Sequence, residues 1–481
     1  MNPKLLKPLI IVAACLVVVI IAASIFAVVS MSPKNKENSS SNASTAAPSA
    51  TYTSVVSSES SQKENSAANS SSQNSTVSSR PTQSTPSKTT TTSGNNTTSS
   101  KPQYSISVNQ KPVQSEESSS NASSEKVTYI DYKFKKLENT YYHLTKDKIL
   151  KIAFIGGSVT DGTGADNPST DSWTRKICDK LKAEYGASVI EEKQSIGGTG
   201  SYFGAFRYAH DVGRTNPDLL FVECAINDCY KKDSYDQVVK SSESIVRQAY
   251  ARNPKIDIVY VLTFDEHRKD ADYEQLRAHK DVAKKYGLLC INLRELLGPS
   301  IEFGAYYSDD VHPNTEGYAL YASTIYDELM KYMPRKRAGI AKAKLKERTS
   351  FPEPLSDYYK NPTLVPSNEM DLPASTKWEF KSDAFSYIGK KYGGFVSANE
   401  DGAKLTINFK GNEFALVYNA APTMGTVLVS VDGGAPITLD AHRDYSNPAP
   451  LKIPVSGNKE HTVTITLKGD KEFQIAAYTY N

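Results

Sequence analysis

Two segments of the chain carry residues suited to nucleophilic catalysis. The first, residues 154–162, reads Phe-Ile-Gly-Gly-Ser-Val-Thr-Asp-Gly and presents Ser158 directly after a short apolar run. Small residues let the backbone turn sharply and expose a hydroxyl group. The second reads Ser-Asp-Asp-Val-His-Pro and ends in His312 and a proline. A histidine can serve as the base for a serine while a neighbouring aspartate orients the ring, so the predicted chemistry is acyl transfer.

Two segments between them could supply hydrogen-bond donors to an oxyanion. Residues 195–201 read Ser-Ile-Gly-Gly-Thr-Gly-Ser, and residues 223–228 read Glu-Cys-Ala-Ile-Asn-Asp. A backbone N–H in the first and the amide of Asn227 in the second are donors of the kind that stabilise such a charge. Taken alone, a glycine-serine turn is often an ordinary turn or a phosphate loop, and Asn-Asp is often a helix cap. The interpretation depends on all four segments together.

Alternating strands and helices are predicted to position these segments. Short apolar runs predict strands at residues 152–155, 188–190, 219–222, 258–262 and 288–291, and amphipathic patterns predict helices at 172–185, 235–252, 273–286 and 315–333. Strands that alternate with helices form a parallel sheet covered on both faces, and ligands gather beyond the carboxyl ends of its strands. The serine segment and both donor segments each follow a predicted strand, so we expect them at one edge of the sheet.

The four segments, in this order, resemble the SGNH, or GDSL-like, hydrolase superfamily. The resemblance implies an α/β fold with a three-layer, flavodoxin-like parallel sheet. It implies that Ser158 is the nucleophile and that Asp309 and His312 form the acid–base pair, with Asp310 as a weaker alternative to Asp309. No cofactor and no metal are implied.

The same resemblance assigns the oxyanion hole to the N–H of Ser158, the N–H of Gly198 and the side chain of Asn227, with Gly197 as a one-residue alternative. The chain departs from the family pattern twice. Its first segment reads Gly-Gly-Ser in place of Gly-Asp-Ser, which resembles bacterial polysaccharide-esterase-like members, and its third reads Ala-Ile-Asn-Asp where glycine is usual. Neither change removes a reacting atom.

A long apolar segment near the N-terminus predicts a membrane anchor. Residues Leu9–Val29 carry no charge and are almost entirely aliphatic, which is enough for a helix to cross a hydrocarbon core of roughly 30 Å. Lys4 and Lys7 precede this segment, so the positive-inside rule places residues 1–8 in the cytoplasm. A cleaved signal peptide is the less favoured alternative, because the apolar run is long and no A-x-A site follows it. We expect a single-pass protein of a bacterial cell membrane with an extracellular catalytic domain.

The remaining chain divides by composition. Residues 30–126, rich in Ser, Thr and Asn, predict a disordered stalk, and residues 127–335 the hydrolase domain. The basic residues that follow predict a solvated helix and linker over 336–372, favoured over an anionic-polymer clamp. Short alternating runs over 373–481 predict an all-β sandwich. This domain resembles the jelly-roll modules that accompany some acetylesterases, usually ahead of the hydrolase.

Composition and spacing exclude several classes. The formal net charge of +3 over 481 residues, without any nucleic-acid-binding motif, predicts no nucleic-acid partner. The scattered cysteines do not form a disulfide framework, although a Cys224–Cys229 bridge stays open. The absence of a C-x-x-C pair or a histidine cluster predicts no metal site. His210, His267 and His279 are interpreted as surface or structural residues, because no partner spacing marks them.

The predicted function is a membrane-tethered extracellular serine esterase that removes O-acetyl or other short acyl groups. The anchor, stalk and sandwich favour a polymeric substrate, an acylated polysaccharide or peptidoglycan. An extracellular O-acyltransferase with the same triad and a non-catalytic carbohydrate-binding surface protein are the alternatives. Aromatic residues that either contact sugar or pack in a core are Trp173, Tyr202 and Phe203 in the hydrolase domain and Trp378, Tyr387 and Tyr392 in the sandwich.

Overall fold

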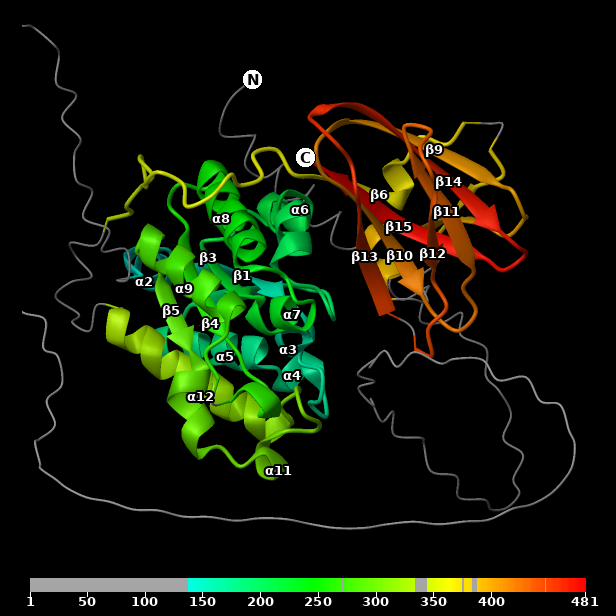
Figure 1. The fold of residues 1–481 in the computed structure, drawn as a ribbon. Helices are drawn as coiled ribbons and strands as arrows, with labels where there is room; N and C mark the ends of the chain where they lie inside the picture. Colours follow the sequence, from blue (N-terminus) through cyan, green and yellow to red (C-terminus); the bar gives the residue numbers. More distant parts are fainter. Residues whose placement is uncertain (1–136, 270, 334–343, 374–375, 383–386, 446) are drawn as a thin grey trace, which may run out of the picture. The chain divides into compact units, whose positions relative to one another are not determined.

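The structure is a computed structural model that describes residues 137–481, apart from residues 270, 334–343, 374–375, 383–386 and 446 (Figure 1). The predicted membrane segment Leu9–Val29 and the predicted stalk lie outside the described residues. Within the described residues, no helix has both the length and the apolar character needed to cross a membrane.

A parallel sheet forms the centre of the first described domain. Its strands are β1 (Ile149–Gly156), β2 (Ser188–Ser195), β3 (Leu219–Glu223), β4 (Asp257–Leu262) and β5 (Leu289–Asn292). They pair in the order β2-β1-β3-β4-β5, which is the flavodoxin-like order. All residues of β3 and β4 are buried. Near-continuous apolar runs, rather than alternating ones, are what strands with two covered faces require.

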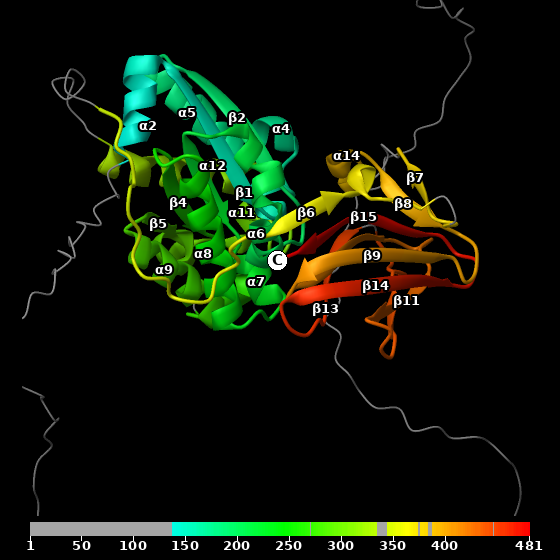
Figure 2. The same cartoon turned by 90° about the horizontal axis from the view of Figure 1, so that it is seen from above.

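Helices cover both faces of this sheet (Figures 1 and 2). Helices α5 (Trp173–Tyr185) and α12 (Thr315–Tyr332) share one hydrophobic core with the sheet, and helices α6 (Ser201–Asp211), α8 (Tyr235–Arg252) and α9 (Glu274–Tyr286) share another. The shorter helices are α2 (Glu138–Tyr142), α3 (Ser158–Asp161), α4 (Pro168–Asp171), α7 (Ala225–Tyr230), α10 (Leu293–Leu297) and α11 (Phe303–Tyr306). The predicted α/β fold is therefore confirmed for this domain.

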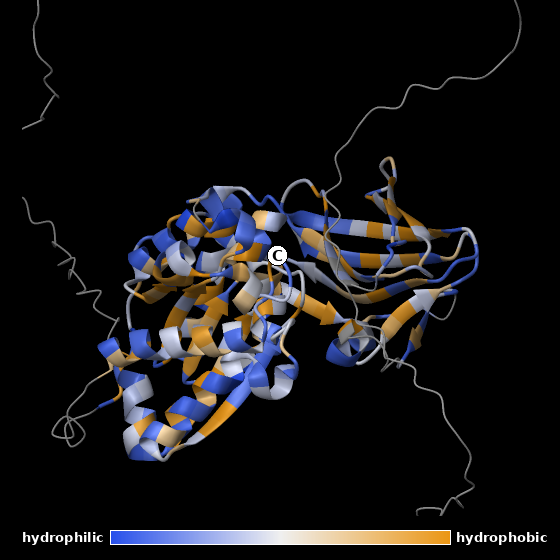
Figure 3. Cartoon of the chain, turned by 90° about the horizontal axis from the view of Figure 1, so that it is seen from below, coloured by the Kyte–Doolittle hydropathy of each residue, from blue (hydrophilic) through white to orange (hydrophobic). Residues whose placement is uncertain are grey.

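The C-terminal residues form two antiparallel sheets. One has the order β13-β10-β15-β8-β7 with β6 paired to β15, and the other has the order β12-β11-β14-β9. The strands are β6 (Thr363–Pro366), β7 (Glu379–Lys381), β8 (Phe395–Ala398), β9 (Lys404–Gly411), β10 (Phe414–Ala420), β11 (Thr426–Val431), β12 (Ile437–Asp440), β13 (Asn447–Ile453), β14 (Lys459–Lys468) and β15 (Phe473–Tyr480), with helix α14 (Tyr387–Tyr392). Buried and exposed residues alternate along β9 and β14, and Figure 3 shows the same alternation of hydropathy. This pattern belongs to sheets with one face in a core.

The sandwich begins earlier than the predicted boundary at residue 373. Strand β6 precedes that boundary, and its residues pair with β15 from Ala477 to Tyr480. Pro362 precedes this strand and Pro366 is its last residue, and its four residues carry little alternation from which to predict a strand. Residues 336–343 of the predicted basic helix and linker lie outside the described residues, and residues 344–362 contain no helix.

The aromatic residues left open by the sequence are core residues wherever their side chains are described. In the hydrolase domain Trp173 and Phe203 are buried, and Tyr202 is 7% exposed. In the sandwich Trp378 and Tyr392 are each 2% exposed. These side chains fill cores rather than offering a surface on which a sugar could stack.

Candidate active site

The nucleophile segment turns sharply between strand β1 and helix α3. A Cβ atom added at Gly156 would lie 2.1 Å from Thr160 Oγ1, and one added at Gly157 would lie 1.9 Å from Asn227 Nδ2. Neither position has room for a side chain, so only glycine allows the end of strand β1 to pack this closely against Thr160 and Asn227. Ser158 follows as the first residue of α3. The Gly-Gly-Ser departure from the family pattern thus corresponds to close packing of Gly157 against the Asn227 amide.

Ser158, His312 and Asp309 form a continuous hydrogen-bonded series. His312 Nε2 lies 2.8 Å from Ser158 Oγ, and His312 Nδ1 lies 2.8 Å from one carboxylate oxygen of Asp309 and 3.0 Å from the other. The backbone N–H groups of Val311 and His312 donate to Asp309 Oδ1. Burial raises the pKa of Asp309, but its hydrogen bonds and the nearby imidazole outweigh burial, and the pKa lies below its usual value.

Asp310, the alternative to Asp309, contacts His267 rather than His312. Its carboxylate lies 3.2 Å from His267 Nε2, and both side chains are largely exposed. This pair lies next to the loop that carries Asp309 and His312, since the N–H of Glu266 donates a hydrogen bond to the carbonyl of Asp310. Of the two aspartates considered, the structure brings Asp309 to His312.

The predicted oxyanion donors lie around the nucleophile. Asn227 is 8% exposed, and its buried Nδ2 has no hydrogen-bond acceptor among the described residues. Gly198 has a φ of +68°, in the region that favours glycine. A Cβ atom added at Gly197 would lie 3.9 Å from Ser158 Cβ, so this loop passes next to the serine. The choice between Gly197 and Gly198 as the backbone donor stays a prediction.

Glu223 was not predicted from the sequence. It ends strand β3 and is 1% exposed, and its carboxylate accepts hydrogen bonds of 2.8 Å from the hydroxyls of Thr160 and Thr263. Burial raises its pKa to about 7, although these two hydroxyls and the Gly157 N–H act in the opposite direction. The signal in the sequence is a carboxylate that ends an otherwise apolar strand. Thr160 ties this carboxylate to the helix that Ser158 begins.

Three other histidines considered in the sequence, His210, His267 and His279, differ in their surroundings. His210 Nδ1 lies 2.8 Å from Asp211, and His267 is exposed beside Asp310, as described above. His279 is fully buried, and its Nε2 lies 2.7 Å from a carboxylate oxygen of Asp228. His279 is therefore a buried residue with a partner that the sequence did not reveal.

Three further features considered in the sequence are Trp173, the pair Cys224 and Cys229, and groups of possible metal ligands. The Trp173 indole N–H donates to the carbonyl of Val159, so this residue supports the turn after the nucleophile. No disulfide joins Cys224 to Cys229. Among the described residues, no three His, Cys, Asp or Glu side chains are grouped so that they could hold a metal ion.

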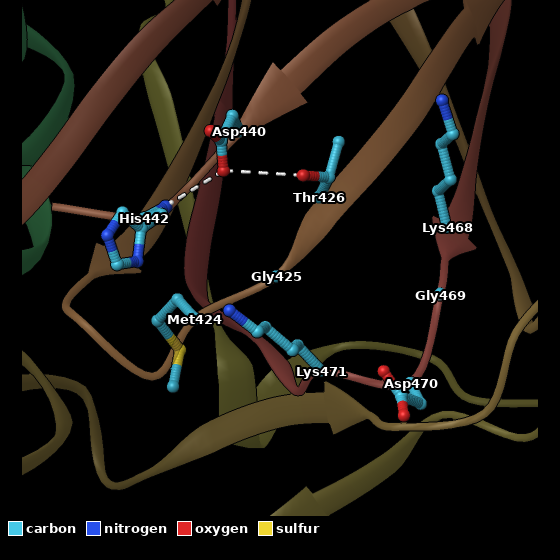
Figure 4. A pocket seen from close by; sticks show the side chains of 9 residues that line it. All are labelled: Met424, Gly425, Thr426, Asp440, His442, Lys468, Gly469, Asp470 and Lys471. Atoms are coloured by element: carbon cyan, nitrogen blue, oxygen red, sulfur yellow. Dashed lines mark hydrogen bonds between the residues drawn. The ribbon is translucent and has the colours of Figure 1, made fainter.

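A surface pocket lies in the sandwich, at the ends of β11, β12 and β14 (Figure 4). Asp440 accepts hydrogen bonds there from the Thr426 hydroxyl and from the backbone N–H of His442. None of the predicted site residues lines this pocket, whose members are Met424, Gly425, Thr426, Asp440, His442, Lys468, Gly469, Asp470 and Lys471.

The parallel sheet and the hydrogen-bonded Ser158, His312 and Asp309 at its carboxyl edge are the arrangement of a serine hydrolase. Residues 154–320 match the model of the GDSL-like Lipase/Acylhydrolase family, so this part of the chain is similar to that family. The protein is accordingly an ester hydrolase. No curated protein sequence matches the chain closely enough to count as a relative.

Solved structures resemble the chain more broadly. A two-domain esterase (CEX) active on acetylated mannans, co-crystallized with mannopentaose, has a TM-score of 0.61 and 24% identity, covering 73% of this chain and 94% of that chain. Axe2, an acetylxylan esterase from Geobacillus stearothermophilus, has a TM-score of 0.33 and 19% identity, covering 39% of this chain and 97% of that chain. The first likeness shows a shared fold.

Proposed function

We propose that the protein is a serine esterase that removes acetyl or other short acyl groups from a carbohydrate polymer. The observation that carries the proposal is the position of His312, within 2.8 Å of both Ser158 Oγ and the Asp309 carboxylate. A buried amide on Asn227 stands beside this series without an acceptor. Together they supply a nucleophile, a base, an orienting carboxylate and a donor for developing charge.

In the first half-reaction, Ser158 Oγ attacks the ester carbonyl carbon while His312 Nε2 takes the hydroxyl proton. Asp309 holds Nδ1–H and stabilises the imidazolium that forms. The carbonyl oxygen becomes negatively charged and accepts hydrogen bonds from Asn227 and backbone N–H groups. As the tetrahedral intermediate collapses, the bond to the alcohol oxygen breaks and His312 returns its proton to that oxygen. The acyl group stays on Ser158.

In the second half-reaction, water attacks the carbonyl carbon of the acyl-enzyme and gives a proton to His312. The bond between the carbonyl carbon and Ser158 Oγ breaks, and His312 protonates the departing serine oxygen. The products are the free carboxylic acid and the original enzyme, so no other reactant is consumed. If a sugar hydroxyl replaced water in this step, the same residues would perform acyl transfer.

The carbohydrate substrate is inferred from the fold and from the order of the domains. A protein with a similar two-domain fold acts on acetylated mannans, which supports an acetylated polysaccharide as the substrate class. The predicted anchor at Leu9–Val29 and the stalk over 30–126 favour a substrate outside the bacterial cell, either an external polysaccharide or acetylated peptidoglycan. The hydrogen-bonded Ser158, His312 and Asp309 favour an enzyme over a binding protein. Acyl transfer would use the same residues, and the similarity to a two-domain esterase favours hydrolysis over it.

The direct test is acetate release by the full-length protein in detergent. Acetylated mannan, acetylated xylan, acetylated peptidoglycan and 4-nitrophenyl acetate are the substrates, and Ser158→Ala is compared with the exposed-serine control Ser300→Ala. We expect Ser158-dependent release from at least one polymer and full activity in the control. Release from the small ester alone would contradict the polymeric substrate, and equal release by Ser158→Ala would contradict the whole proposal.

A further inference from the structure

A second Asp–His pair lies buried behind the candidate oxyanion hole. Asp228 directly follows Asn227 on helix α7, and His279 lies on helix α9. Asp228 Oδ2 is 2.7 Å from His279 Nε2, and both side chains are fully buried. Burying a carboxylate is costly unless it is fully hydrogen-bonded, so a pair in this position needs a physical reason.

The second carboxylate oxygen of Asp228 contacts the segment that provides the backbone donor of the candidate oxyanion hole. The N–H of Ser201 donates to Asp228 Oδ1 at 2.6 Å, at the first residue of helix α6. A Cβ atom added at Gly200 would lie 1.9 Å from this same oxygen, so the carboxylate and the loop pack in direct contact. Gly197 and Gly198 belong to that loop. One carboxylate thus links the helix that carries Asn227 to the loop that carries the candidate backbone donor.

His279, the partner of this carboxylate, has a hydrogen-bond partner on its other ring nitrogen. His279 Nδ1 lies 3.2 Å from Ser242 Oγ on α8, and Ser242 Oγ lies 2.7 Å from the hydroxyl of Tyr260 on β4. Every side chain in this series is buried. Because each member has its hydrogen bond, the network fixes the orientation of Asp228 rather than leaving it free to rotate.

Asn227 depends on such support. Its Nδ2 has no acceptor among the described residues, so no hydrogen bond from this amine fixes the amide direction. The position of the donor is then set by the backbone of α7 and by packing against Gly157. Oxyanion donors act only when they are aimed at the developing charge, and a misplacement of about 1 Å can cost about a hundredfold in rate.

We propose that Asp228 and His279 are positioning residues that hold Asn227 and the loop containing Gly197 and Gly198 at the separation needed to bind an oxyanion. Neither residue touches the substrate. The inference rests on the proposed esterase function and adds two residues to it. It also explains why α6, α7 and α9 are tied together at the carboxyl edge of the sheet.

The test compares variants of the full-length protein in detergent on 4-nitrophenyl acetate. Asp228→Leu removes both acceptor oxygens, Asp228→Asn keeps an acceptor for the Ser201 N–H, and His279→Gln removes the ring. We expect kcat to fall about 100-fold in Asp228→Leu, with less loss in Asp228→Asn and His279→Gln and with KM nearly unchanged. If Asp228→Leu does not fold, the kcat values of Asp228→Asn and His279→Gln test the proposal instead.

The matched control is Asp257→Asn. Asp257 is another buried aspartate, and it accepts hydrogen bonds from the N–H and hydroxyl of Thr140 at the amino end of β4, the opposite edge of the sheet. We expect kcat of Asp257→Asn to stay that of the wild type. A fall in kcat of the same size in Asp257→Asn would mean that loss of a buried hydrogen bond anywhere lowers activity, which would overturn the proposal.

A double variant, Asn227→Ala with Asp228→Asn, separates positioning from an independent effect. If Asp228 acts through Asn227, kcat of the double variant falls little below that of Asn227→Ala alone. Multiplication of the two single effects, or variants at Asp228 and His279 with unchanged kcat, would overturn the proposal while leaving the esterase function in place. A wild-type protein without Ser158-dependent hydrolysis would instead overturn the proposed function itself, and the inference with it.

Discussion

Replacing Glu223 by Gln tests the buried carboxylate that supports the nucleophile turn. Burial raises the pKa of Glu223 from 4.5 to about 7 in the folded protein. The folded protein therefore binds the proton more tightly than the unfolded chain does. This preference contributes stability below about pH 4.5, and the contribution is lost as the pH rises through about 7. Since the side chain is fully buried, solvent does not screen the effect.

The size of the effect follows from the difference between the two pKa values. Raising the pKa from 4.5 to about 7 corresponds to about 3 kcal/mol of stability that disappears between these pH values. A glutamine cannot ionise, so it does not lose this contribution. It keeps nearly the same shape and can hydrogen-bond with the hydroxyls of Thr160 and Thr263. Relative to the wild type, the variant should gain about 3 kcal/mol between pH 4 and pH 8.

The assay is urea unfolding of the wild type and Glu223→Gln at pH 4 and pH 8. Other groups that titrate, such as Asp257, whose pKa burial raises to about 6, contribute equally to both proteins and cancel in the comparison. The quantity of interest is the change, between the two pH values, of the difference in unfolding free energy. A difference that is the same at both pH values would refute the reasoning, because Glu223 would then ionise as readily in the folded protein as in the unfolded chain.

Three further outcomes are expected. Asn227→Ala should lower kcat on 4-nitrophenyl acetate about 100- to 1,000-fold with little change in KM, as measured by steady-state kinetics, because one oxyanion donor is lost; a change confined to KM would contradict this role. Asp309→Asn should lower kcat about 10,000-fold, since the imidazole tautomer is no longer held; Asp310→Asn, its matched control, should stay near wild type in the same assay. Incubation with EDTA should leave acetate release unchanged, because the proposed steps use only groups of the chain and water; loss of activity that zinc restores would contradict them.

The sequence predicts the hydrolase fold because its signals are local. Buried strands such as Leu219–Glu223 need apolar runs, and the turns after them need small residues, so both leave a readable pattern. The same logic brings Ser158 and Asn227 to one edge of the sheet, since each directly follows a strand. The position of His312 is less local, and it was predicted through resemblance to a family.

The supporting residues could not be predicted because their partners are distant in sequence. Asp228 and His279 meet across 51 positions, and Glu223 meets Thr263 across 40. His279 lies on the buried face of α9 together with Leu276 and Val282, a pattern that by itself indicates only a core helix. No spacing along the chain shows that this face meets a carboxylate.

The start of the sandwich was misplaced for a related reason. Strand β6 has four residues and ends in Pro366, so it lacks the length and alternation that mark β9 or β14. It becomes a strand only through pairing with β15, which lies more than a hundred residues later in the chain. Edge strands of this kind are set by tertiary contacts rather than by their own sequence.

In the proposed mechanism, Ser158 carries the acyl group between the two half-reactions. Full-length protein mixed with acetylated mannan oligosaccharide and quenched rapidly in acid can be digested and analysed by mass spectrometry. We expect the mass of one acetyl group on the peptide that contains Ser158, and no such mass in Ser158→Ala. Acetate release that continues in Ser158→Ala, with no acetyl group on this peptide in the wild type, would contradict the proposed mechanism.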